Sequence, residues 1–131
     1  MKNTCVLYKK VIYYCLRSKE EERGTALREF YGGIFIDKET LLASGIEYPI
    51  KLEYYKTRNT KENNKHQDIY GIQIIKTEYK KEVNVEEEKI EYITENERDI
   101  NNILEKFKEN EVTPVSAQYV IEDMLKYMQK N

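Results

Sequence analysis

The chain has few of the residues that carry covalent or acid–base catalysis. Its single histidine, His66, lies in a polar stretch without apolar residues, whereas a catalytic histidine needs a positioned partner and a shielded site. The two cysteines, Cys5 and Cys15, would need a nearby base to act as nucleophiles, and His66 is the only histidine in the chain. No nucleophile motif supports a Ser-His-Asp arrangement. We therefore expect a solvated histidine, buried inert thiols and no enzymatic activity.

Metal-binding and phosphate-binding patterns are also missing. Two cysteines and one distant histidine make a poor ligand set for zinc. The acidic run at 86–88 lacks the spacing and the glycine of a calcium loop, and we expect it in a solvated turn. Gly32 and Gly33 are not followed by the lysine of a phosphate-binding loop. The sequence thus predicts no metal and no cofactor.

Basic and aromatic residues gather around one expected hairpin loop, residues 57–68. The candidates for contact with a partner are Tyr54, Tyr55, Lys56, Arg58, Lys61 and Lys65. Basic hairpins can enter DNA grooves, and tyrosines can stack on bases. However, Glu62 and Asp68 dilute the positive charge, and a nucleic-acid binder usually has a concentrated basic face. Nucleic acid is therefore the second choice of partner.

Length and composition limit the class of protein. The 131 residues suffice for one core, so we expect a single domain over residues 1–131. No run approaches the roughly 18 to 20 uncharged apolar residues of a membrane helix. The first residues include Lys9 and Lys10 and lack a signal-peptide cleavage site. With only two cysteines, a reduced, cytoplasmic protein is expected.

The net charge of −2 is unevenly distributed. Residues 1–82 carry 16 Lys and Arg against 12 Asp and Glu, a balance of +4, and residues 83–131 carry 6 against 12, a balance of −6. Such an asymmetry can orient a protein partner. The chain also has 12 tyrosines, and exposed tyrosines provide contact area that interfaces favour. We therefore expect an unknown protein partner or self-association.

Two C-terminal segments have the periodicity of amphipathic helices. Residues 95–109 carry an apolar stripe, Thr94 and Glu97 have the spacing of a capping box, and Asn110 suits a left-handed stop. Residues 114–128 follow Thr113 and Pro114, which are suited to start a helix. The two predicted apolar faces consist of Ile100, Ile103, Leu104 and Phe107 and of Ala117, Val120, Ile121, Met124 and Met128.

The remaining apolar segments predict strands. Residues 50–55 alternate apolar and polar positions, and Tyr70–Tyr79 places Tyr70, Ile72 and Ile74 on one face. Val11–Leu16 and Leu27–Ile36 are further strands, and the glycine pair of the second indicates a bulge or a close backbone approach. A short helix is expected over 37–45, and a last strand at Ile90–Ile93 after an acidic turn at 85–89.

Several of these features in their order resemble a family of small clostridia-type bacterial proteins of unknown function. The resemblance rests on three features: the YGI-x-I strand from Tyr70, the Val112-Thr113-Pro114 turn and the acidic helix with Glu122 and Asp123. The match covers about residues 47–128. The resemblance implies a bacterial cytoplasmic protein and brings no catalytic residues. Residues 32–55 are also similar to swapped-hairpin transcription factors, but the charge pattern near the first strand differs from theirs.

Together these patterns predict an α+β domain. We expect an antiparallel sheet of about four to five strands, with two C-terminal helices packed on one face. The expected function is a non-enzymatic protein-interaction or regulatory module. The alternative is a small DNA-binding transcriptional regulator that uses the basic 56–65 hairpin or a swapped-hairpin dimer.

Overall fold

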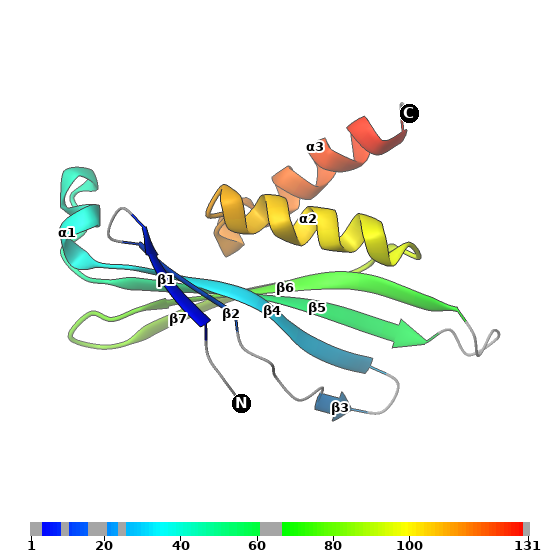
Figure 1. Ribbon diagram of the computed structural model, residues 1–131, viewed down its shortest axis with the longest axis horizontal. Coiled ribbons are helices and arrows are strands. Elements are labelled where there is room, and N and C mark those ends of the chain that lie inside the picture. Colours follow the sequence, from blue (N-terminus) through cyan, green and yellow to red (C-terminus); the bar gives the residue numbers. More distant parts are fainter. Residues whose placement is uncertain (1–3, 9–10, 16–20, 24–25, 61–66, 130–131) are drawn as a thin grey trace.

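A computed structural model describes residues 4–8, 11–15, 21–23, 26–60 and 67–129, with side chains from 27–60 and 67–127. The described strands form one antiparallel sheet in the order β1-β2-β4-β5-β6-β7, and β3 pairs with β4 beside this path. All the described helices lie on the upper side of the sheet in Figure 1. The strands are β1 (Thr4–Tyr8), β2 (Val11–Cys15), β3 (Glu21–Arg23), β4 (Ala26–Ile36), β5 (Ile50–Thr60), β6 (Asp68–Glu78) and β7 (Asn84–Thr94).

Alternation along the central strands divides the sheet into two faces. Residues 50–60 of β5 pair with 78–68 of β6 without interruption, so even-numbered residues of both strands share one face. That face is apolar and carries the helices. Its fully buried side chains, together with those of the helix above it, are Ile34, Leu52, Tyr54, Ile72, Ile74, Ile100, Ile103, Leu104 and Phe107.

Helix α2 (Glu97–Glu109) is the main cover of this face. The four residues of its predicted apolar stripe are all buried, as the helical spacing requires. The prediction of a capping box at Thr94 and Glu97 is wrong. The N-cap is Asn96, whose side chain accepts from the amides of Arg98 and Asp99. Thr94 instead accepts from the amide of Asn96.

The chain turns from α2 into a 3₁₀ turn, η2 (Pro114–Ser116), and then into α3 (Ala117–Gln129). The left-handed residue is Glu111, with φ 52°, and not Asn110 as predicted. Thr113 makes no side-chain cap to a backbone amide; its hydroxyl contacts that of Ser116 at 3.2 Å. Ala117 and Ile121 are buried as expected, so α3 is anchored through its first two turns.

Two irregularities shape the sheet. β4 has a bulge between Phe30 and Gly32, one residue before the predicted glycine pair. In the β6–β7 pairing the register shifts between Tyr70 and Ile72. There a Cβ on Gly71 would lie 2.4 Å from the carbonyl oxygen of Ile90 and 2.7 Å from Thr57 Oγ1. Glycine is therefore required for β7 to approach β6 this closely.

The α+β class and the helices on one face are confirmed, and three details differ. The sheet has seven described strands because β1 and β3 join the five that were predicted. The acidic segment 85–89 is part of β7, not a turn. β5 continues to Thr60 and β6 begins at Asp68, so the connection is shorter than the predicted 57–68 loop. The short helix is confirmed as α1 (Lys38–Leu41) followed by η1 (Leu42–Ser44), with Asp37 as N-cap and Gly45 left-handed at the end.

Candidate functional site

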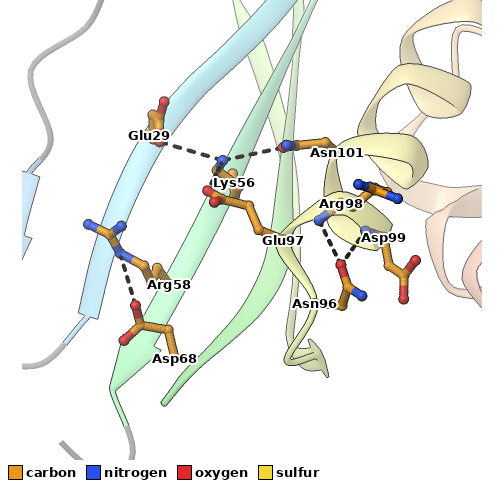
Figure 2. A network of polar contacts seen from close by, with 9 residues as sticks. All are labelled: Glu29, Lys56, Arg58, Asp68, Asn96, Glu97, Arg98, Asp99 and Asn101. Carbon is orange, nitrogen blue, oxygen red and sulfur yellow. Dashed lines mark hydrogen bonds and ion pairs between the residues drawn. The ribbon is translucent and has the colours of Figure 1, made fainter. Parts of the chain in front are cut away.

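The predicted contact residue Lys56 belongs to β5 and not to a loop. Its even-numbered position directs the side chain to the helix-covered face, where it reaches the first turns of α2. Lys56 Nζ lies 2.9 Å from Glu97 Oε2, 3.3 Å from Asn101 Oδ1 and 3.8 Å from Glu29 Oε2 (Figure 2). Only 11% of the Lys56 side chain is exposed, so it connects β4, β5 and α2.

Arg58 is the next residue of β5 on the same face, and it lies diagonally across the β5–β6 pair from Asp68. Arg58 Nε lies 3.9 Å from Asp68 Oδ2, and Asp68 Oδ1 accepts from the Thr60 hydroxyl at 3.0 Å. A small hollow is lined by Leu27, Glu29, Lys56 and Arg58. We refer to Glu29, Lys56, Arg58, Asp68 and Glu97 as the Lys56 cluster.

The electrostatics of the Lys56 cluster disfavour an anionic ligand. Its two cations face three carboxylates, those of Glu29, Asp68 and Glu97. The hydrogen bond from Lys56, and then its positive charge, lower the pKa of Glu97 from the usual value. A phosphate entering the hollow would meet an excess of negative charge. The cluster is a network of ion pairs that joins the sheet to α2.

The two predicted tyrosines lie on opposite faces of the sheet. Tyr54 is fully buried, its hydroxyl donates to the Val112 carbonyl at 2.8 Å, and burial raises its pKa. Tyr54 thus has no free surface and fastens the end of α2. Tyr55 is half-buried on the other face, where its ring lies 5.4 Å from that of Phe30 and 4.3 Å from the Arg28 guanidinium.

Several residues from the sequence argument lie outside the described side chains. Lys61, Lys65 and His66 fall in the gap between β5 and β6, and the side chains of Cys5 and Cys15 are not described. Among the described residues, no three His, Cys, Asp or Glu side chains are grouped where they could hold a metal ion. None of the described helices combines the length and apolar character that crossing a membrane requires.

A second polar group, the Glu78 cluster, lies at the other end of β6 and was not predicted. Glu78 is 6% exposed and accepts from the Tyr48 hydroxyl and from Asn84 Nδ2, each at 2.8 Å. Lys76 and Lys80 approach it to 3.7 Å. The hydrogen bond from Asn84 is the largest cause of a lowered Glu78 pKa, and the bond to Glu78 raises the pKa of Tyr48. The sequence contains one signal for this cluster: Glu78 has the same even-numbered spacing as Tyr70, Ile72 and Ile74. This spacing places Glu78 on the apolar face of β6.

The sheet face away from α2 is aromatic and polar, and no described helix covers it (Figure 1). Register places Phe35, Lys51, Thr77 and Val85 in one row across β4 to β7. The Phe35 ring lies 6.2 Å from that of Tyr79, and Tyr79 and Val85 are exposed. Farther along the same face Phe30, Thr57, Asn59 and Gln73 are buried. We therefore call only the exposed part, around Phe35, Tyr79 and Val85, the open face.

Comparison with known proteins identifies a family but no activity. The model of a family of unknown function, DUF6514, matches residues 34–127, and the chain belongs to this family. The match begins before residue 47, where the resemblance seen in the sequence began. Neither a curated protein nor a solved structure matches the chain.

Proposed function

We propose that this member of a family of unknown function is a protein-interaction or regulatory module without catalytic activity. The observation that carries the proposal is the open face, a sheet surface with aromatic residues that no helix of the described residues covers. We place the protein in a bacterial cytoplasm, as the clostridia-type resemblance and the two lone cysteines suggest.

The residues of the open face suit contact with a protein. Phe35 and Tyr79 form an aromatic pair, and aromatic side chains are enriched in the centre of protein interfaces. Several polar groups farther along the same face are satisfied within the sheet: Arg28 donates to Gln73, Gln73 donates to Glu87, and Tyr55 donates to Glu53. Thr57 Oγ1 and Asn59 Nδ2 are exceptions that have no partner among the described residues. A partner that covers this face would therefore leave few of these groups without hydrogen bonds.

The alternative of a DNA-binding regulator receives less support. Two of its expected cations, Lys56 and Arg58, are engaged by carboxylates. DNA phosphates would have to replace these ion pairs, which would reduce the free energy of unfolding and the free energy gained on binding. Lys61 and Lys65 remain candidates for such contacts.

The test is a pull-down from a lysate of the source organism with the purified protein, with and without nuclease. The double variant Phe35→Thr/Tyr79→Ser removes the aromatic pair. Leu42→Ser is the matched control, because Leu42 is also an exposed apolar residue but lies in η1 and not in the sheet. Thermal unfolding establishes that both variants are folded.

We expect a defined protein that is retained after nuclease treatment and at moderate salt, lost with the double variant and kept with Leu42→Ser. Recovery of nucleic acid that disappears at higher salt, and with Lys56, Arg58 and Lys61 changed to Ala, would reverse the ranking of the two functions. Equal retention by the double variant would contradict the role of the open face.

A further inference from the structure

Strand β7 is an edge of the sheet that the described strands form. The strand order of the described residues ends with β7, so the backbone groups on its outer side have no strand partner there. From Asn84 to Ile90 the strand keeps an unbroken register with β6. At about 3.3 Å per residue this regular edge is roughly 23 Å long. Such an edge is a template for an added strand.

The charge of β7 decides which strand could be added. β7 carries four glutamates, Glu86, Glu87, Glu88 and Glu91, against Lys89, a net charge of −3. Glu86, Glu87 and Glu88 are consecutive, so carboxylates project from both faces of the edge. The neighbouring strand does not neutralise them fully: Lys76 lies opposite Glu86 in register but contacts Glu78. Glu86 Oε2 is buried and has no hydrogen-bond partner among the described residues.

The same carboxylates oppose pairing with a second copy of this chain. An antiparallel pairing over the whole regular edge would place Glu87 opposite Glu87 of the other copy, and Glu86 opposite Glu88. Like charges directly across a strand pair are destabilising. A strand with Lys or Arg at these positions would instead gain an ion pair at each of them. Exposed Val85 and Tyr92 near the two ends of β7 offer apolar contacts to its remaining side chains.

We propose that β7 accepts, as an added edge strand, an extended Lys/Arg-rich segment of a partner protein. The inference rests on the proposed interaction function and specifies the chemistry of a partner at a second surface. Backbone hydrogen bonds along residues 84–90 would supply affinity, and the glutamates would select basic over acidic segments.

The test uses the peptide Lys-Val-Lys-Thr-Lys-Val-Lys-amide with fluorescein on its N-terminal α-amine. Fluorescence anisotropy measures the affinity, and amide hydrogen exchange by NMR gives the location. One control peptide has Glu in place of each Lys. A second keeps all lysines but carries N-methyl groups on alternate amides, which blocks strand pairing and leaves the charge unchanged. The protein variant is Glu86→Gln/Glu87→Gln/Glu88→Gln, in which the amide oxygen at position 87 can still accept from Gln73.

We expect the lysine peptide to bind with a Kd below about 1 mM and to slow amide exchange within residues 84–90. The triple variant should weaken binding by about tenfold or more, since three charge contacts are lost. The glutamate and N-methyl peptides should not slow exchange in β7.

Binding of the N-methyl peptide as tight as that of the lysine peptide would overturn the proposal, since it would show attraction without strand pairing. Absence of β7 protection at saturating lysine peptide would overturn it as well. These outcomes are independent of the interaction function, because Phe35→Thr/Tyr79→Ser leaves the β7 sequence intact. A partner that depends on the open face, together with a peptide that fails to bind β7, would retain the function and reject this inference.

Discussion

The Lys56 cluster and the Glu78 cluster lie at opposite ends of the same apolar face and are built with opposite charges. In the first, a cation 11% exposed is held by carboxylates that are themselves about half exposed. In the second, a carboxylate is held by two neutral donors and two lysines. Lys56 connects the sheet to α2, whereas Glu78 connects β6 to the segment before β5 and to the start of β7. One cluster therefore joins two layers, and the other closes the end of a single layer.

The largest effect should come from removing the central acid. Glu78→Ala leaves the Tyr48 hydroxyl without its acceptor and removes the carboxylate that Lys76, 18% exposed, contacts. We expect a loss of about 2 kcal/mol in the free energy of unfolding, measured by urea denaturation. Glu109→Ala is the matched control, because its ion pair with Lys106 is exposed and should contribute less than about 0.5 kcal/mol. Equal losses in both variants would mean that burial of Glu78 adds nothing.

Removal of the central cation should have a smaller effect. After Lys56→Met, Glu97 and Glu29, which are 52% and 47% exposed, can recover hydration. We expect a loss of about 1 kcal/mol, with faster amide exchange in the first turns of α2. Lys106→Met, near the other end of α2 and 63% exposed, is the control. If exchange in α2 is unchanged, Lys56 does not join the layers as described.

Acid should reduce the contribution of both clusters to the free energy of unfolding. We expect each reduction to be smaller than the loss caused by Glu78→Ala or Lys56→Met. The folded-state pKa values of Glu78 and Glu97 are lowered from 4.5. Their contribution to stability is therefore complete above about pH 4.5 and is lost as the pH falls through the lowered folded-state values. Urea denaturation at several pH values should show a shallower decline below pH 4.5 for Glu78→Gln and for Glu97→Gln than for the unmodified protein. A steeper decline of the free energy of unfolding in either variant would contradict the lowered pKa of the glutamate that it replaces.

The sequence predicted those parts that depend on local periodicity. Alternation in β5 and β6 and the stripes of α2 and α3 identified the core, because apolar burial imposes the period of each element. The acidic segment 85–89 was misplaced because glutamate is uncommon in strands, yet an edge strand exposed on one side tolerates it. The Lys56 cluster could not be foreseen, since Glu97 is 41 residues distant and only the fold brings it near.

The single hydrogen bond from Tyr54 to Val112 has a consequence for the order of folding. It spans 58 residues, so it forms only after β5 and the end of α2 have met. Contacts of such long separation generally form late, because closing the intervening chain costs entropy. Tyr54→Phe should therefore accelerate unfolding about five- to tenfold for a loss of about 1 to 1.4 kcal/mol and leave the refolding rate nearly unchanged. In stopped-flow experiments, the hydroxyl of Tyr54 would then act on the lifetime of the native state and not on the time needed to reach it.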